Sequence, residues 1–476
     1  MKLAGGNATA QLLTIALVPV ITRIYPPEAY GQFATVAALI TFITSVSSLR
    51  YSAAILIPKD EIVSAALLWV GLSAVFAISC LCLLFVAMGN GVLGSLLGLG
   101  EHSVILYLVP TGVFLAGVKL VLDPWYLRGK LFGRLAVSQI SGAATDRASV
   151  IALGLGASAS AGNLLIGRQI GQTVEMVSLL TVKRCRPTQF LKTRNRIGAM
   201  SSAALEYRRF PKYAWSSLVQ QGTTQIPVPM LAAFFGPAIA GFFALARRML
   251  LQPVYVLGDA LARTFFEKVS ADFRAGRELG PNTLKLVQGL LSLFLPPIAI
   301  VAVYAPELFS TIFGARWMQA GYFVRWLAPM FLTVLVLRPL SIFFDLFQKQ
   351  RELAIFNLVS LIGMAAALTV GGLYGSADAA IGLYVAVGFL VVVVRALWLF
   401  QQAGVAISDA THMVAREIIR GAIVIAPLVM LRAYHPSQGS VDVAIVVVGI
   451  GLYFLYWLRF IPYGRDLTKW WRNRKG

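Results

Sequence analysis

The sequence predicts an all-α polytopic membrane protein. Of its 476 residues, 58% are hydrophobic and only 13% are charged, and the mean hydropathy is +0.76. Soluble domains carry about twice that share of charged residues. The formal net charge of +21 would suggest a nucleic-acid partner in a soluble protein. Here the basic residues gather in the connections between apolar runs, so we expect no nucleic-acid partner.

Fourteen apolar runs are long enough for helices that cross a bilayer, which takes roughly 20 residues. Another run follows the first within a few residues and no cleavage site separates them, so the first run is predicted to be a transmembrane helix rather than a signal peptide. The connections are mostly short and rich in turn-forming residues. The predicted spans are 4–24, 30–50, 62–87, 104–122, 134–155, 161–182, 213–235, 238–261, 284–305, 321–346, 353–373, 379–401, 413–432 and 441–460.

The distribution of positive charge supports this set of spans. With Lys2 on the cytoplasmic side, most of the 41 Lys and Arg residues fall in connections on that side. Only Arg23, Arg316 and Arg432 fall in connections on the other side, which agrees with the positive-inside rule. One crossing too many or too few would distribute the Lys and Arg residues over both sides of the membrane. We therefore predict that both termini are cytoplasmic.

A long basic connection divides the chain. Residues 183–212 are rich in Lys and Arg and contain one acid, Glu206. This composition is explained if the segment sets the orientation of the chain in the membrane and links two groups of helices. The alternative is that the segment binds anionic lipid or a partner. The predicted organisation is an N-lobe of six helices (1–182), the basic cytoplasmic linker (183–212), a C-lobe of six helices (213–402), and a C-terminal helix pair with a basic tail (403–476).

An internal repeat relates the two lobes, because residues 210 positions apart match in one register. The two copies are separated by an even number of crossings and so share one orientation. Parallel repeats of this kind occur in secondary transporters. Matched prolines, glutamines and glycines are harder to obtain by chance than matched apolar residues. The pairs are Gln11 with Gln221, Thr14 with Thr224, Pro19 with Pro229, Pro27 with Pro237, and Gly31 with Gly241.

Polar residues form a stripe on the first helix of each lobe. Their spacing of three to four residues places them on one helix face. They either line a cleft shared by the two lobes or form hydrogen bonds between helices, and the sequence supports both explanations equally. The stripes are Asn7, Gln11 and Thr14 in the first copy, and Ser217, Gln221 and Thr224, with Gln225 beside them, in the second.

Two adjacent arginines, Arg247 and Arg248, lie near the middle of the apolar run 234–261. An arginine at the bilayer centre costs at least about 2.5 kcal/mol. Neighbours on a helix point about 100° apart, so both cannot easily face one partner. We expect at least one to face a polar, protein-lined space. The alternative is that one arginine pairs with a carboxylate and the other reaches the membrane surface.

Other charged residues recur inside the predicted crossings. Arg168 and Glu175 lie two helical turns apart, and Arg338 and Asp345 have the same spacing. Basic residues outnumber acidic ones inside these spans, which favours passage of an anion over a balanced set of ion pairs. The guanidinium group binds phosphate through two parallel hydrogen bonds. The acidic residues inside the predicted spans are Asp146, Glu175, Asp259 and Asp345.

No catalytic or metal-binding pattern is found. The sequence contains no phosphate-binding GxxxxGK[ST] loop, and no Ser-His-Asp or Cys-His set. The three cysteines and three histidines are scattered, so we expect no disulfide, metal or cofactor. One GxxxG motif, Gly167 to Gly171, is explained by helix packing. We predict that the chain is not an enzyme.

Several segments resemble known sequences. They are Gly6–Gln11 (GNATAQ), Thr22–Gly31 (TRIYPPEAYG), Arg50–Pro58 (RYSAAILIP), Tyr207–Pro211 (YRRFP), and Phe235 to Pro253 with GPAIAGFFALARR. Through them the chain resembles bacterial polysaccharide-biosynthesis (O-antigen-type) flippases of the multidrug/oligosaccharidyl-lipid/polysaccharide exporter superfamily. The resemblance implies two six-helix lobes around a cationic cavity. It also implies that an undecaprenyl-diphosphate-linked sugar moves from the cytoplasmic to the periplasmic leaflet of the bacterial inner membrane, with helices 13 and 14 sheltering lipid tails.

The family pattern has one arginine after a glutamine where this chain has two, and Arg248 is the closer match. On this basis the substrate-binding candidates are Arg248, Arg247, Arg147, Arg168, Arg338, Gln11, Gln221 and Gln225. Candidates for coupling transport to a proton or sodium gradient are Glu175, Asp146 and Asp345. The expected partners are a lipid-diphosphate oligosaccharide, membrane lipids, a polysaccharide polymerase and a chain-length regulator.

Three other functions stay open. A peptidoglycan-precursor flippase fits a cationic cavity equally well. A multidrug antiporter of the same superfamily would instead favour an acidic, aromatic cavity. A membrane-bound polymerase or ligase normally carries a sizeable external loop with catalytic groups, and the external loops predicted here are short.

Overall fold

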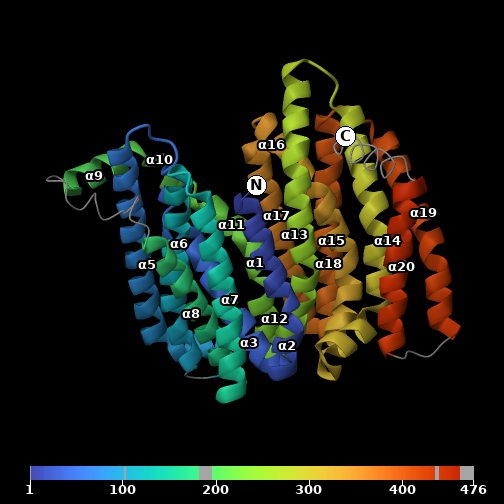
Figure 1. The fold of residues 1–476 in the computed structure, drawn as a ribbon, viewed down its shortest axis with the longest axis horizontal. Helices are drawn as coiled ribbons and strands as arrows, with labels where there is room; N and C mark the ends of the chain where they lie inside the picture. The colour runs from blue at the N-terminus through green and yellow to red at the C-terminus, as the bar shows by residue number, and fades with distance from the viewer. Residues whose placement is uncertain (1, 101–102, 182–195, 435–438, 461–476) are drawn as a thin grey trace. The chain divides into compact units, whose positions relative to one another are not determined.

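The computed structural model describes residues 2–100, 103–181, 196–434 and 439–460 (Figure 1), and the regular elements within them are helices. The all-α fold class is thereby confirmed. The chain forms two compact units. The first comprises Met1–Ala244 and Leu368–Ala377, and the second comprises Leu245–Ala367 and Asp378–Gly476. A bilayer core offers no water to backbone N–H and C=O groups, and helices satisfy these groups internally.

The first unit holds the helices drawn from blue to green in Figure 1. In chain order they are α1 (Lys2–Ala16), α2 (Val18–Ile24), α3 (Pro27–Ser47), α4 (Tyr51–Ala54), α5 (Glu61–Leu96), η1 (Val104–Tyr107), α6 (Leu108–Arg128), α7 (Phe132–Gly156), α8 (Ala161–Leu180), α9 (Arg196–Glu206), α10 (Arg209–Lys212), α11 (Ala214–Gln225) and α12 (Pro227–Phe235).

Three helices run across the division between the units: α13 (Pro237–Arg274), α17 (Gln350–Tyr374) and α18 (Ala377–Gln402). The remaining helices belong to the second unit. They are α14 (Gly280–Phe313), η4 (Ala315–Trp317), α15 (Met318–Leu340), α16 (Ile342–Leu346), α19 (Ile407–Tyr434) and α20 (Gly439–Phe460).

Each predicted span falls on one of these helices or on two consecutive ones. Within the described residues, seven helical segments are long and apolar enough to cross a membrane by length and composition alone. Three predicted spans are interrupted in the structure, as α1–α2, α11–α12 and α15–α16. Prolines explain the first two interruptions, because Pro19, Pro227 and Pro229 lack the N–H that would continue the helical ladder.

The helices of the first unit pack through small residues. On α8, Gly167 and Gly171 lie against α7: a methyl group at Gly171 would come within 2.5 Å of the Cβ atom of Asp146, and one at Gly167 within 2.6 Å of a methyl group of Val150. The GxxxG motif is therefore a packing motif, as its spacing predicted. The helix α3 packs against α6, α8, α11 and α12.

The predicted linker is partly structured. Residues 182–195 lie outside the described residues, but α9 follows them and packs against α5. Ala203 of α9 is buried in a hydrophobic cluster with Leu67 and Tyr126, so this half of the basic segment belongs to the first unit. The lobe limits 1–182 and 213–402 remain a prediction. The basic tail after Phe460 also lies outside the described residues.

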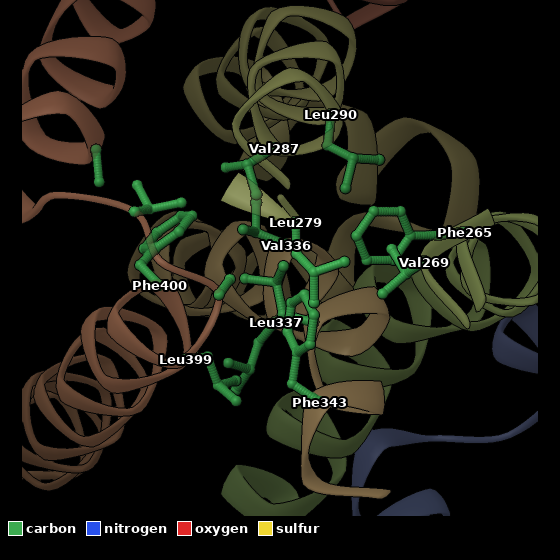
Figure 2. Close-up of a cluster of buried hydrophobic side chains, with 14 of the residues drawn as sticks. Phe265, Val269, Leu279, Val287, Leu290, Val336, Leu337, Phe343, Leu399 and Phe400 are labelled. Atoms are coloured by element: carbon green, nitrogen blue, oxygen red, sulfur yellow. The ribbon is translucent and has the colours of Figure 1, made fainter. Parts of the chain in front are cut away.

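The second unit is built on α14, which packs against α15, α19 and α20. Its hydrophobic core brings together side chains from α13, α14, α15, α16 and α18 (Figure 2). The rings of Phe265 and Phe343 meet edge to face with centroids 6.1 Å apart. The C-terminal helices are fastened to α14 by polar contacts as well: the Tyr304 hydroxyl donates to the carbonyl of Leu428, and Trp457 Nε1 donates to Ser292.

Candidate functional site

Buried charges gather in the first unit where α6, α7 and α8 meet. The amine of Lys119 on α6 lies 2.8 Å from Glu175 Oε1 on α8 and 3.0 Å from Asp123 Oδ2, one turn along its own helix. Glu175 is 9% exposed as a residue. A methyl group at Gly142 of α7 would lie 2.8 Å from the Cβ atom of Glu175, so the missing side chain at Gly142 lets the carboxylate fit between the helices.

A second ion pair lies beside the first. Arg147 Nη2 donates to Asp146 Oδ2 at 2.6 Å, and both side chains are largely buried. The Oδ1 atom of Asp146 is buried without a hydrogen-bond partner among the described residues. Two of the proposed coupling residues, Glu175 and Asp146, therefore lie in neighbouring ion pairs, and each has a cation as its partner.

This arrangement adds one carboxylate to the acids that were predicted inside the spans. Asp123 was excluded from the predicted span 104–122, but α6 continues to Arg128 and places Asp123 beside Lys119. The cluster of Lys119 and Arg147 is matched by three carboxylates rather than two. It is a network of ion pairs and not a free cationic surface.

The polar stripe of the second repeat lies on α11, which packs along α3. Its hydrogen bonds stay mostly within the helix: the Thr224 hydroxyl donates to Gln221 Oε1 at 3.3 Å, and Gln225 Nε2 donates to the Thr224 hydroxyl at 3.4 Å. These long contacts leave the amide groups of Gln221 and Gln225 able to turn toward another partner. The stripe also contacts another element at Ser217, which accepts a hydrogen bond from Arg50.

Sequence reasoning did not identify Arg50 as a site residue. It has a left-handed backbone (φ 60°) at the start of α4, and this turn directs its guanidinium group to Ser217 on α11. The only signal in the sequence was its place at the head of the segment RYSAAILIP. Pairing between residues 167 positions apart depends on the packing of α11 with the rest of the first unit.

The polar stripe of the first repeat lies on α1, which packs against α7. Gln11 is half-buried, and its Oε1 atom is buried without a hydrogen-bond partner within the described part of the chain. The side chain of Asn7 lies outside the described side chains. An unsatisfied amide oxygen in an apolar setting costs free energy, which favours a polar ligand or water at Gln11 over a purely structural role.

The two stripes also share a backbone feature. The first interruption lies at Leu17, between α1 and α2, and the second at Ile226, between α11 and α12. Pro19 and Pro229, which are matched in the repeat, each follow an interruption. Since each proline lacks an N–H, the carbonyl groups of Ile15 and Gln225 have no donor four residues ahead. Interrupted helices next to polar residues are typical of substrate sites in secondary transporters.

Direct contact between the two repeat copies confirms their register. Gly31 of α3 lies against the first turn of α13, where a methyl group would overlap the carbonyl oxygen of Pro237. Gly241 of α13 lies against the first turn of α3, where a methyl group would overlap the carbonyl oxygen of Pro27. Each contact is the repeat image of the other, as a local twofold axis requires.

The paired arginines lie in the second unit, on α13. Arg247 and Arg248 are both half-buried, and their neighbours Leu245 and Ala246 are fully buried. The Nη1 atom of Arg247 is buried and has no hydrogen-bond partner among the described residues. No described carboxylate accepts a hydrogen bond from this atom, so it can donate to an anion.

A further set of candidates lies on α15, α16 and α18. Arg395 Nη2 donates to the Ser341 hydroxyl at 3.3 Å, and its guanidinium group lies 4.9 Å from the ring centroid of Phe344. Arg338 is half-buried on α15, but Asp345 is exposed on α16 and accepts a hydrogen bond from Gln350 at 2.7 Å. A turn at Ser341 interrupts the helix between Arg338 and Asp345, which the sequence had placed on one continuous helix.

Two candidate sets result, and each is described within its own unit. In the first unit, the structure brings Arg147, Asp146 and Glu175 together, and α8 also carries a half-buried Arg168. In the second unit, Arg247, Arg248 and Arg338 are half-buried on helices. Among the described residues, no group of three or more His, Cys, Asp or Glu could hold a metal ion. The available chemistry is binding of an anion by guanidinium groups and proton exchange at paired carboxylates.

Comparison with known proteins gives a family and a fold for the chain. A family model described as "Polysaccharide biosynthesis protein" matches residues 20–321. No curated protein matches the chain. Among solved structures, a lipid II flippase, MurJ, in an inward closed conformation is similar with a TM-score of 0.72 and 11% identity, over 98% of this chain and 99% of that one.

Multidrug transporters also share the fold. An inward-facing transporter of the MATE family within the MOP superfamily is similar with a TM-score of 0.57 and 14% identity, over 85% of this chain and 94% of that one. A eukaryotic MATE transporter gives a TM-score of 0.53 and 14% identity, over 87% and 97%. These proteins with the same fold are a flippase and transporters, not enzymes.

Proposed function

Because the chain belongs to the polysaccharide biosynthesis protein family, we propose that it is a flippase for a lipid-linked oligosaccharide. Its substrate is an undecaprenyl-diphosphate-linked repeat unit of an O-antigen, capsule or exopolysaccharide. It moves this substrate from the cytoplasmic to the periplasmic leaflet of the bacterial inner membrane by alternating access. A polysaccharide polymerase and a chain-length regulator would act on the translocated product.

The observation that carries this proposal is the buried Nη1 atom of Arg247 on α13, next to Arg248, which has no hydrogen-bond partner among the described residues. A buried cation without a carboxylate partner is costly, and a ligand that supplies negative charge offsets this cost. A diphosphate fits, because the guanidinium fork matches phosphate oxygens. Arg338, Arg147 and Arg168 are further candidates for contact with the diphosphate.

The glutamines of the two polar stripes would form hydrogen bonds with the sugar. Gln11, Gln221 and Gln225 carry amide groups that are unsatisfied or weakly bonded. An amide offers both donors and an acceptor, which suits the alternating hydroxyl groups of an oligosaccharide. Their place beside the interrupted helices α1 and α11 lets such contacts change when those helices bend.

Coupling to an ion gradient would use the ion-pair network of the first unit. Protonation of Asp146 would remove the negative charge opposite Arg147 and make this guanidinium group available to the anionic substrate. Protonation of Glu175 would leave Lys119 paired with Asp123 alone. Asp345 is a weaker candidate, because it is exposed and lies outside this network.

Reconstitution tests the proposal. Purified protein in vesicles with an asymmetrically placed lipid-diphosphate oligosaccharide should make the sugar accessible to a lectin on the opposite side. Arg248→Ala and Arg247→Ala should each reduce the rate at least tenfold. Arg274→Ala is the matched control, since Arg274 is exposed near the end of the same helix and, among the described residues, donates to the carbonyl of Ser270. Normal flipping by both arginine variants would refute the role of this pair.

A peptidoglycan-precursor flippase is the second candidate, favoured by the similarity to the lipid II flippase over nearly the whole of both chains. The same vesicles separate the two functions if lipid II and a lipid-diphosphate oligosaccharide are supplied in turn. Faster movement of lipid II would favour the second candidate. Release of inorganic phosphate or growth of the glycan in the same assay would instead indicate a membrane enzyme.

A further inference from the structure

A pocket in the second unit lies apart from the candidate residues described above. It has a volume of about 420 Å³ and is lined by Ala302 and Val303 of α14, Arg325 of α15 and Arg432 of α19. It lies at the end of the helices where α14 leads to α15 and α19 leads to α20. The charge distribution of the sequence predicts that this end faces the periplasm.

The positive charge of this pocket departs from the pattern of the rest of the chain. Arg432 is one of only three basic residues predicted in the outer connections. Arg325 lies about two turns after the start of α15 at Met318. The positive-inside rule disfavours cations here, so two arginines at one outer pocket indicate a local use for positive charge.

Among the described side chains, one carboxylate, Glu307, pairs with these arginines. Arg432 Nη2 lies 2.6 Å from Glu307 Oε1, and its Nη1 atom is buried without a hydrogen-bond partner among the described residues. Arg325 Nη2 donates to the carbonyl of Val303 at 3.0 Å. The net charge of the three side chains is therefore +1, with guanidinium donors still available.

Aromatic rings hold both arginines in place. The Arg325 guanidinium carbon lies 5.2 Å from the ring centroid of Tyr322, and that of Arg432 lies 5.4 Å from the ring centroid of Tyr304. The Tyr304 hydroxyl donates to the backbone of α19, which fixes its ring. Such stacking orients a guanidinium group without consuming its N–H donors, so the pocket is preorganised for an anion.

The surroundings of the pocket are those of a membrane interface. On α15, Tyr322 is 38% exposed and Trp326 is 50% exposed; on α19, Met430 is 63% exposed. Tyr and Trp concentrate at the boundary between headgroups and hydrocarbon. Exposed apolar residues next to a basic pocket accommodate acyl chains while the arginines meet a headgroup.

We propose that this pocket binds the phosphodiester group of an anionic phospholipid in the outer leaflet. A phosphodiester carries one negative charge, which matches the net charge of +1 in the pocket, whereas a diphosphate carries more. The volume fits a headgroup, and the exposed apolar residues of α15 and α19 receive the acyl chains. The site lies within the second unit and is independent of the substrate that the protein transports.

Lipid retention by the full-length protein tests the proposal. In native mass spectrometry with phosphatidylglycerol, Arg325→Gln should weaken lipid binding about tenfold, the effect of losing one charge-assisted contact. Arg325→Lys keeps the positive charge but loses the two parallel N–H donors of the guanidinium group, so it should weaken lipid binding less than Arg325→Gln does. Arg316→Gln is the matched control, because Arg316 is an exposed cation in η4 at the same end of the unit, and it should bind as the unmodified protein does.

A variant with the opposite effect excludes misfolding as the cause. Glu307→Gln removes the balancing negative charge but keeps an oxygen acceptor for Arg432, so it should increase the retention of phosphatidylglycerol several-fold. Zwitterionic phosphatidylethanolamine should bind more weakly than phosphatidylglycerol to every form. Equal retention by Arg325→Gln and the unmodified protein would overturn the proposal. Complete displacement of the lipid by inorganic phosphate would also overturn it, since the pocket would then be a site for free phosphate.

Discussion

Gly31 and Gly241 lie against each other's helix at equivalent positions of the internal repeat. A methyl group at Gly31 would come within 2.9 Å of the backbone nitrogen of Gly241, and one at Gly241 would come within 3.0 Å of the backbone nitrogen of Gly31. Backbone meets backbone at this crossing of α3 and α13. The absence of side chains at both positions is what allows the two copies of the repeat to meet.

The first prediction concerns this crossing. Gly31→Ala should destabilise the protein by about 3 kcal/mol or more, because the new methyl group overlaps backbone that cannot move aside as a side chain would. Gly133→Ala is the control: it lies in α7 with nothing within 4 Å of the added methyl group, so it should change stability by about 1 kcal/mol at most. Thermal unfolding in detergent measures both. A Gly31→Ala protein as stable as the control would show that the helices do not meet this closely.

The second prediction concerns the ion pair of Lys119 and Glu175. Lys119→Met should cost about 3–5 kcal/mol, because it leaves a buried carboxylate without its partner. Adding Glu175→Gln to this variant should restore much of the loss, since the charge that lacked a partner is then removed. Lys285→Met, at an exposed position of α14, should leave stability unchanged. If the double variant is no more stable than Lys119→Met, the two residues do not form a coupled pair.

The third prediction concerns the interrupted helices. Pro19→Ala or Pro229→Ala supplies an N–H that can donate to the carbonyl four residues back, which removes the helix defect and should raise the unfolding temperature. We expect flipping in vesicles to fall in the same variants, because a straight helix loses the bend beside the polar stripe. Pro281→Ala is the control, since Pro281 lies at the start of α14, where a proline interrupts no hydrogen bond. Unchanged flipping would assign the prolines a folding role only.

The fourth prediction concerns the attachment of α19 to α14. Glu417 is 3% exposed and accepts hydrogen bonds from Gln288 Nε2 at 2.8 Å and Arg420 Nη1 at 2.9 Å. Glu417→Gln should destabilise the protein by about 1–3 kcal/mol, the usual cost of weakening charge-assisted hydrogen bonds to a buried group.

The control for this variant is Glu352→Gln, which removes a half-exposed ion pair with Lys349 at 3.6 Å. Pairs of this kind contribute about 0–1 kcal/mol. Urea unfolding of the two proteins gives the comparison. Equal stability of the two variants would mean that Glu417 does not hold the C-terminal helices in place.

Much of the fold follows from apolar length and the matched repeat. The spans were predictable because a helix that crosses a bilayer needs a run of apolar residues, whatever its neighbours are. The register of 210 residues predicted that Gly31 and Gly241 are equivalent. It could not predict that they touch, because contact depends on how the copies pack.

The candidate site was less predictable for the same reason. The arginines were visible as charges in apolar helices, but the sequence does not say which carboxylates they meet. Asp123 lay just outside the predicted span 104–122, and it proved to be a partner of Lys119. Arg50 reaches Ser217 because its backbone is left-handed. The periodicity of polar and apolar residues in the sequence does not predict such a backbone conformation.

The reciprocal packing of Pro27–Gly31 on Pro237–Gly241 has a consequence for how the protein originated. A surface that fits its own copy is what a homodimer with twofold symmetry requires. A shorter ancestral chain carrying one such segment would dimerise through it, and tandem duplication of its gene would fuse the two subunits into one polypeptide. The matched glycines are then the remnant of an ancient subunit interface.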